Sequence, residues 1–283
     1  MNIGIRLHDT APGTLEARLR FAAAQGFSCE HLAMSKAMDG FRMEDAPEKL
    51  DRAMADRVRE AHRAAGVKCA VLGCYLNLAD PDRESREKTQ EIYRAHLRFA
   101  GMIGAGVVGT ETYANPKSVF SRPAPEDEEA FRLFMDSLKD VVRFAEEEGA
   151  ILAVEPVWCH IISTPERAQR MLEEADSDNL QIILDAVNLI SPEAAGDAER
   201  VDRTIEDAIR RLGDRVRVMH MKDYILKDDG GMEACACGTG CMRYERLLGF
   251  AGLNRLPMTL ENTVPDNAEG ARLFLEKTAK QLQ

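Results

Sequence analysis

Four residues able to bind a metal or to move a proton each end a short apolar run in the second half of the chain. They are Glu155, Asp185, His220 and Glu261. Carboxylates held close together repel one another unless a cation lies between them. Three carboxylates and one imidazole suit a hard divalent ion. The four residues therefore predict a site for one such ion, Mn²⁺ first, with Mg²⁺, Co²⁺ and Zn²⁺ also compatible.

The apolar runs also indicate the fold that would bring these residues together. Eight short runs alternate with longer segments of 3.6-residue periodicity. The runs span 3–7, 28–33, 68–72, 107–110, 151–155, 181–185, 217–220 and 258–261. Several are apolar at almost every position, which is typical of parallel strands buried on both faces. Eight successive β-then-α units predict a closed (β/α)8 TIM barrel, with a doubly wound open sheet as the alternative.

No domain boundary interrupts this pattern, so residues 1–283 are expected to form one domain. In a closed barrel, functional side chains extend from the carboxyl ends of the strands and from the loops that follow. The four residues should therefore meet at the barrel mouth. The longest insertion, 224–241, follows the seventh run and is expected to be a mouth loop or lid.

Composition restricts the class of partner. The chain has 37 basic and 48 acidic residues, for a net charge of −11, which argues against binding nucleic acid or an anionic membrane. No run approaches the ~18 apolar residues needed to span a bilayer. The opening residues do not resemble a secretory signal, so a cytoplasmic protein is expected. Seven cysteines, an odd number, favour reduced thiols.

Five motifs carry a resemblance that covers nearly the whole chain. They are AVEP (153–156), ILDAVNL (183–189), VMHMKD (218–223), GTGCMRYERLL (238–248) and MTLEN (258–262). With these motifs the chain resembles the xylose isomerase-like barrel superfamily, which includes sugar isomerases, ketose 3-epimerases, inosose dehydratases, hydroxypyruvate isomerases and endonuclease four.

The resemblance implies a metal-dependent isomerase or epimerase of a ketose or related carbohydrate or polyol. In the epimerases, a metal-bound carbonyl acidifies the neighbouring C–H through an enediolate. Carried over by position, Glu155 and Glu261 would exchange the proton, while Asp185 and His220 would serve chiefly as ligands. The expected partner is a small carbohydrate, and a homo-oligomer is left open.

One stretch, 74–89, looks more like endonuclease four. The nucleases carry one histidine just before the tyrosine of this stretch and another at the end of the fourth strand. This chain has Gly73 or Cys74 at the first place and Gly109-Thr110-Glu111 at the second. Without these imidazoles a three-zinc cluster is hard to build, which argues against a nuclease. Tyr75 and Asn77 would then line a substrate pocket.

Further residues are candidates for binding the substrate. Asn188 stands where many relatives have a histidine that touches substrate oxygen, and it cannot titrate near neutral pH. Lys222 would either polarise a substrate oxygen or pair with an acid such as Asp223. The remaining candidates are His8 (rather than its neighbour Arg6), Glu111, Trp158 and His160.

Two alternative functions remain. One is a lyase on the same scaffold, either a keto-polyol dehydratase or a 3-keto-glycoside deglycosidase. The other is a non-catalytic sugar-binding barrel, against which the four retained ligands argue. Separately, Cys235, Cys237 and Cys241 form a C-x-C-x3-C pattern that lacks a fourth soft ligand for a metal, and the glycines beside them favour a tight turn.

Overall fold

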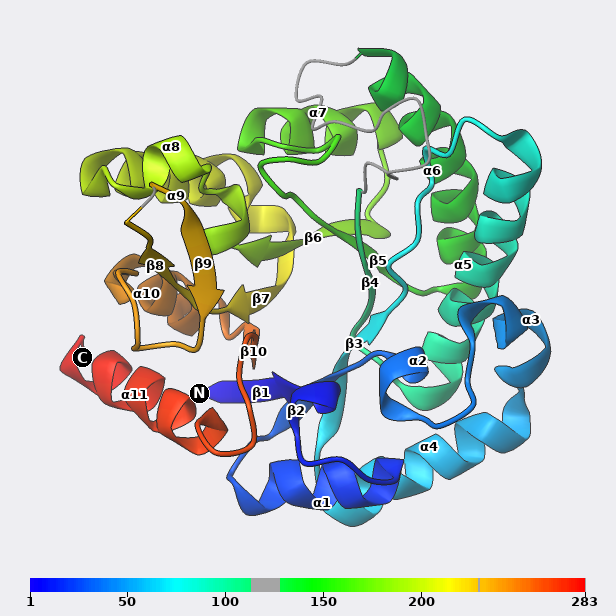
Figure 1. The fold of residues 1–283 in the computed structure, drawn as a ribbon. Coiled ribbons are helices and arrows are strands. Elements are labelled where there is room, and N and C mark those ends of the chain that lie inside the picture. The colour runs from blue at the N-terminus through cyan, green and yellow to red at the C-terminus, as the bar shows by residue number, and fades with distance from the viewer. Residues whose placement is uncertain (113–127, 229, 283) are drawn as a thin grey trace.

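The computed structural model describes residues 1–112, 128–228 and 230–282. In this part of the chain eight parallel strands close into a barrel, in the order β1-β10-β7-β6-β5-β4-β3-β2, as Figure 1 shows. The strands are β1 (Asn2–Arg6), β2 (Cys29–Leu32), β3 (Lys68–Gly73), β4 (Val107–Glu111), β5 (Leu152–Glu155), β6 (Leu180–Asp185), β7 (Val216–Met221) and β10 (Pro257–Leu260). The predicted (β/α)8 barrel is confirmed, and the open sheet is excluded.

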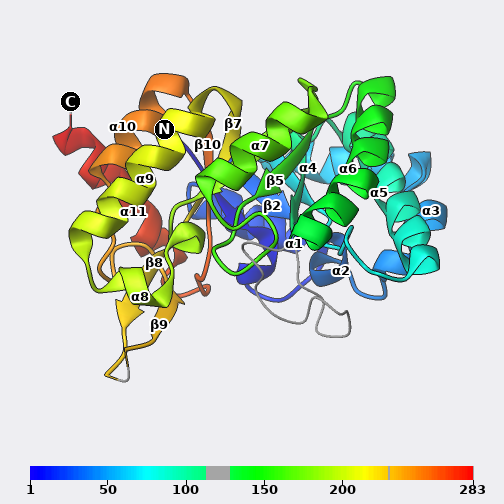
Figure 2. The same ribbon diagram turned by 90° about the horizontal axis from the view of Figure 1, so that it is seen from above.

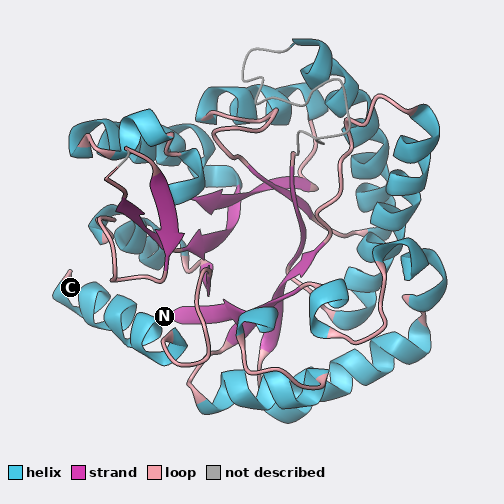
Figure 3. Ribbon diagram, viewed as in Figure 1, coloured by secondary structure: helices cyan, strands magenta, loops and turns pink. Residues whose placement is uncertain are grey.

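Helices surround the barrel (Figure 3). The longer ones are α1 (Leu15–Ala24), α4 (Arg52–Ala65), α5 (Arg83–Ile103), α6 (Glu128–Glu148), α7 (Pro165–Ala175), α9 (Ala198–Leu212), α10 (Glu245–Asn254) and α11 (Ala268–Gln281). Short helices α2 (Met34–Ala37), α3 (Ala46–Lys49) and α8 (Pro192–Ala195) lie in connections that follow strands. No described helix is both long enough and apolar enough to cross a membrane.

Helix starts follow the capping signals in the sequence. The Thr164 side chain accepts a hydrogen bond from the Arg167 backbone N–H, and Pro165 is the first helical residue of α7. Proline suits this position because its missing N–H would have no partner inside the helix. Asp51 caps α4 in the same way, accepting from the Met54 N–H.

The strand register sets the level of the predicted ligands. Asp185 lies opposite His220 on the neighbouring strand, and His220 lies opposite Thr259, two residues before Glu261. Glu111 lies opposite Glu155 in the same way. The register therefore gathers these side chains at one end of the barrel, where the strands end.

The insertion after β7 is more ordered than the predicted mouth loop. It contains an antiparallel pair, β8 (Asp223–Leu226) and β9 (Met232–Cys235). Figure 2 shows this hairpin extending beyond the barrel on the side of α8. Its pairing was missed because two strands of four residues around a glycine-rich turn carry little periodic signal.

A single buried carboxylate holds the hairpin in place. Asp223 Oδ1 accepts hydrogen bonds from the backbone N–H of Tyr224 and Met242, each at 2.8 Å. Its Oδ2 accepts from the N–H of Gly238 and Gly240, each at 3.0 Å. A Cβ at Gly240 would lie 2.1 Å from the Tyr224 carbonyl oxygen, so this close approach requires glycine. Asp223 therefore orients the turn rather than pairing with Lys222.

Replacing this carboxylate tests its role. Asp223→Ala leaves four backbone donors without their acceptor, so we expect the free energy of unfolding to fall by about 3 kcal/mol. Amide hydrogen exchange should show the largest loss of protection in residues 232–242. Asp228→Ala, at an exposed position in the same hairpin, is the matched control and should change little. Equal destabilisation by both substitutions would contradict this role.

Candidate metal and substrate site

The four predicted ligands converge at the mouth of the barrel, and all four are buried. His220 Nδ1 lies 2.9 Å from Glu155 Oε2 and 3.2 Å from Glu261 Oε1. Asp185 joins them through Lys222, whose Nζ lies 3.0 Å from both Asp185 Oδ2 and Glu261 Oε2. The strand ends thus bring three carboxylates and one imidazole into one cluster, which His220 and Lys222 connect.

Lys222 pairs with two members of the cluster rather than with Asp223. Burial lowers the pKa of Lys222, but Asp185 and Glu261 outweigh burial and raise that pKa above its ordinary value. The ammonium group therefore stays charged. It compensates the charge of one of the three carboxylates. The other two carboxylates carry two negative charges, which one divalent cation would balance.

His220 responds to the same excess of negative charge. Burial lowers the pKa of its imidazole, but Glu155 and Glu261 outweigh burial and raise that pKa to about 9. Burial also raises the pKa of Asp185 to about 6. For Glu261, burial opposes ionisation, while Lys222 and His220 lower the pKa below its usual range. Bound protons and the Lys222 ammonium group therefore compensate the negative charge that a metal ion would compensate in an occupied site.

The donor atoms fit a metal ion. One ligand atom from each of Glu155, Asp185 and His220 lies within 4.8 Å of the other two. The short contacts of His220 Nδ1 do not have hydrogen-bond geometry, and its buried Nε2 has no hydrogen-bond partner. Buried polar atoms without partners are costly, and a coordinated cation satisfies them.

One further imidazole belongs to this site and was missed in the sequence. His31, on β2, stacks on His220 with ring centroids 5.2 Å apart and on Tyr75 at 5.5 Å. Both of its ring nitrogens are buried without a hydrogen-bond partner. It also forms a second group of candidate ligand atoms with His220 and Glu261. Residue 31 lies within a predicted strand. The alternation of side chains along β2 was therefore the signal that could have placed His31 on the inner face of the barrel.

Glycine makes room for this histidine. A Cβ at Gly73 would lie 2.7 Å from His31 Nε2 and 2.9 Å from the Tyr75 ring. Real Cβ atoms do not approach other atoms so closely, so a side chain at this position would displace His31 or Tyr75. The absence of a side chain at Gly73 is therefore a condition for the stacked pair.

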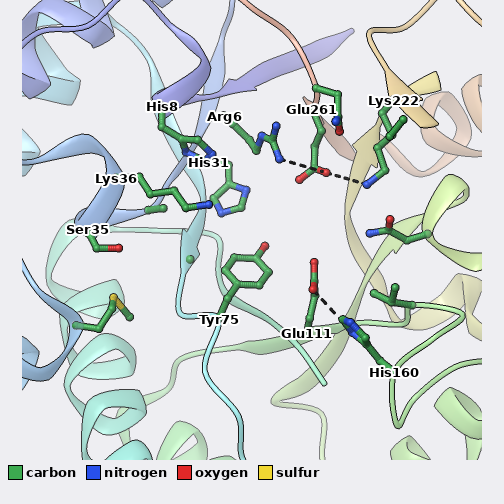
Figure 4. A pocket seen from close by; sticks show the side chains of 17 residues that line it. Arg6, His8, His31, Ser35, Lys36, Tyr75, Glu111, His160, Lys222 and Glu261 are labelled. Atoms are coloured by element: carbon green, nitrogen blue, oxygen red, sulfur yellow. Dashed lines mark hydrogen bonds and ion pairs between the residues drawn. The ribbon is translucent and has the colours of Figure 1, made fainter. Parts of the chain in front are cut away.

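A polar cavity of about 460 Å³ lies above the cluster (Figure 4). It is lined by Arg6, His8, His31, Ala33, Ser35, Lys36, Met43, Gly73, Tyr75, Glu111, Val157, His160, Asn188, Lys222, Ala234, Glu261 and Asn262. Six of the predicted substrate-binding residues are among them: His8, Tyr75, Glu111, His160, Asn188 and Lys222. The hairpin contributes one wall through Ala234.

Three residues differ from expectation. Arg6 was expected to face away from the mouth, but it lines the cavity, and its Nη1 lies 3.7 Å from Glu261 Oε2. Asn77 does not line it, and its side-chain oxygen accepts from the Ala79 N–H. Trp158 lines a separate cavity with residues of α7 and α9. Arg6 is the last residue of β1, whereas Asn77 and Trp158 lie in loops, whose backbone carries no periodic signal.

Asn188 acts on the cluster directly. Its side-chain Nδ2 donates to Glu155 Oε1 at 2.6 Å, and its backbone N–H donates to Asp185 Oδ1 at 3.0 Å. Asn188 therefore orients two predicted ligands while it also lines the cavity. A neutral amide performs this task at any pH, which a histidine at the same place would not.

Glu111 and His160 form a pair on the wall of the cavity. His160 Nδ1 lies 3.8 Å from Glu111 Oε2 (Figure 4). Burial, with the nearby Glu155 adding to it, raises the pKa of Glu111 to about 8. Burial lowers the pKa of His160 to about 4. At neutral pH this wall therefore presents a protonated carboxyl group and a neutral imidazole, both able to donate a hydrogen bond.

The family model of the xylose isomerase-like TIM barrel matches residues 19–276. The chain belongs to this family. No curated protein matches the sequence significantly. The comparison with family models therefore establishes the superfamily that the sequence motifs indicated.

Three solved structures illustrate the shared fold. A D-tagatose 3-epimerase-like protein has a TM-score of 0.76 at 17% identity, with 100% of this chain and 98% of that chain covered. The 3-keto-D-glucoside 4-epimerase of E. coli has a TM-score of 0.73 at 15% identity, covering 98% and 99%. The IOLI protein with a bound zinc atom has a TM-score of 0.70 at 15% identity, covering 100% and 98%. At these identities the likeness shows the fold alone.

The raised pKa of Glu111 predicts a pH-dependent stability. The unfolded carboxyl group loses its proton near pH 4.5, whereas the folded one keeps it until about pH 8, so its contribution to stability is lost as pH rises between these values. In chelator, Glu111→Gln should gain about 2 kcal/mol over the wild type by pH 9. Near pH 4.5 the two proteins should be equally stable.

Urea unfolding at several pH values measures this difference. Exposed Glu173→Gln, on α7, is the control and should follow the wild type throughout. A constant difference between Glu111→Gln and the wild type from pH 4.5 to 9 would show that Glu111 titrates normally.

Proposed function

We propose that this protein is a divalent-metal-dependent isomerase or epimerase of a ketose or related carbohydrate. The observation that carries the proposal is the convergence of Glu155, Asp185, His220 and Glu261 beneath a polar cavity of sugar size. These four residues would hold one ion, with Mn²⁺ the leading choice. When bound, the ion would polarise a substrate carbonyl and acidify the C–H beside it.

The residues of the chain would move the proton. Oxygens of Glu155 and Glu261 approach the same His220 nitrogen from two different strands, so one carboxylate can take the proton and the other can return it. Asn188 and Lys222 would keep the two carboxylates in their orientations. Tyr75, whose buried hydroxyl has no hydrogen-bond partner, would donate to a substrate oxygen.

A second candidate function is a lyase that starts with the same proton removal. The observation that favours it is Glu111, a carboxyl group that is protonated at neutral pH and lines the cavity beside His160 (Figure 4). Such a group can protonate a leaving hydroxyl or glycosidic oxygen one carbon further along the substrate. The structural likeness includes a 3-keto-D-glucoside 4-epimerase, so 3-keto glycosides belong among the substrates to be tested.

Exchange in D2O tests the function. The Mn²⁺-loaded protein is incubated with ketoses, inososes and 3-keto glycosides, and deuterium and products are followed by mass spectrometry and NMR. Deuterium in an intact carbon skeleton indicates an isomerase or epimerase, whereas loss of water or of an aglycone indicates a lyase. Glu155→Gln and Glu261→Gln should each slow exchange about 10²–10⁴-fold, and Glu173→Gln should not. Exchange at the wild-type rate in both cluster variants would refute the proton-transfer roles.

Metal content tests the site independently of activity. The chain reconstituted with Mn²⁺ and desalted should retain about one ion, and the double variant Glu155→Gln plus Glu261→Gln should retain at least about tenfold less. Mn²⁺ is chosen because this hard ion favours oxygen ligands over thiolates. Full Mn²⁺ retention by the double variant would show that Glu155 and Glu261 are not the ligands of this ion.

A further inference from the structure

A second cluster of ligand-type side chains lies on the other face of the barrel wall. Glu30 on β2 lies opposite Cys69 on β3, and His62 belongs to α4, which packs against β3. One ligand atom from each residue lies within 4.8 Å of the other two. Side chains alternate along a strand, so Glu30 faces the helices while its neighbour His31 faces the mouth cavity. None of the three residues takes part in the site described above.

The histidine is oriented as a ligand. His62 Nδ1 lies 2.8 Å from the Val58 carbonyl oxygen, to which only a protonated nitrogen can donate. The other nitrogen, Nε2, then faces Glu30 Oε1 at 3.0 Å. Metal-binding histidines are commonly held in this way, with one ring nitrogen bound to a backbone carbonyl and the other directed at the ion. Between Nε2 and the carboxylate there must be either a second proton or a cation.

The surroundings of the Glu30 carboxylate and the Cys69 thiol also favour a bound cation. Glu30 is fully buried, and its Oε2 has no hydrogen-bond partner of normal geometry. Burial raises the pKa of Glu30, and burial together with Glu30 raises the pKa of the Cys69 thiol. Oε1 faces His62, but a buried carboxylate oxygen without a partner, such as Oε2, is costly, and a cation shared with the thiol removes this cost.

We propose that Glu30, His62 and Cys69 form a second metal site, which binds Zn²⁺ or a similar thiophilic divalent cation. Two ligands of a tetrahedral Zn²⁺ lie about 3.3–3.8 Å apart, so shifts of about 1 Å suffice for these side chains to reach it. Binding releases two protons to solvent: the Cys69 proton, because the thiolate is the ligand, and the proton between His62 Nε2 and Glu30, because that nitrogen binds the ion.

The ion has a route of entry and an open coordination position. A cavity of about 510 Å³, lined by His62, Cys69, Gly66 and Lys68, lies beside the cluster. Arg63 also lines this cavity, but its guanidinium group donates to both carboxylate oxygens of Glu60. Water can take the fourth position. Since its ligands come from β2, β3 and α4, the site ties a helix to the barrel wall, a structural role separate from the mouth.

Co²⁺ is the probe, because a thiolate bound to Co²⁺ gives an ultraviolet charge-transfer band. The predicted ligands at the mouth contain no sulfur, so this band reports on the second site. The reduced full-length wild type should develop the band to saturation by about two equivalents of Co²⁺, because the mouth also binds this ion. Cys69→Ser should lose it. Cys74→Ser, which changes another buried cysteine just after β3, is the matched control and should keep it.

Further measurements separate this proposal from the function of the mouth. Glu155→Gln plus Glu261→Gln should keep the band while losing Mn²⁺. Zn²⁺ should abolish the band by competition and raise the Tm of this double variant, but not of the triple variant that also carries Cys69→Ser. No band in the wild type, or a band of full strength in Cys69→Ser, would overturn the proposal. The former result would leave Glu30 and His62 as a proton-bridged pair, and the latter would assign the metal to other cysteines.

Discussion

The electrostatic repulsion among three buried carboxylates is the constraint on which the mouth of this barrel depends. Glu155, Asp185 and Glu261 cannot all be ionised there without positive charge between them. Lys222 supplies part of that charge from within the cluster, and His220 responds by binding its proton more tightly. When a divalent ion takes the place of the His220 proton, it can balance the two negative charges that Lys222 leaves uncompensated.

The surroundings of the cluster serve to hold this unfavourable arrangement in place. Asn188 holds Glu155 by its amide, and Arg6 approaches Glu261 from the first strand. The hairpin that closes one wall is fixed by the four backbone hydrogen bonds of Asp223. Each of these contacts opposes movement of the charged groups away from one another. Preorganisation of this kind lets a site bind an ion and a polar substrate at low cost in reorganisation.

Strand β2 shows how one barrel wall can serve two chemistries. His31 and Glu30 are adjacent in sequence, yet one contributes to the mouth and the other to the layer between barrel and helices. The alternation of a β-strand separates them by the thickness of the sheet. A change on the outer face can therefore alter stability without touching the substrate cavity, which is an advantage for a fold that places its chemistry at one end.

The sequence by itself determined the barrel and the strand-end positions of the four predicted ligands. Buried parallel strands are apolar along their length, so Glu155, Asp185 and His220 stand out at their ends, and Glu261 just after one. The closure of eight strands then follows from the repeat of β-then-α units. Six of the eight predicted substrate-binding residues line the cavity for the same reason, because they lie at or after strand ends.

Only the tertiary structure decided which neighbours complete the site. His31 lies inside an apolar run and pairs in space with residues about 190 positions away, a relation that no local pattern encodes. Asn77 and Trp158 depend on loop backbone, where side-chain direction has no period, and the contact of Arg6 with Glu261 joins the two ends of the chain. The cluster of Glu30, His62 and Cys69 joins two strands and a helix, so it exists only after these elements pack. Periodicity specifies elements, whereas contacts between elements are set by packing.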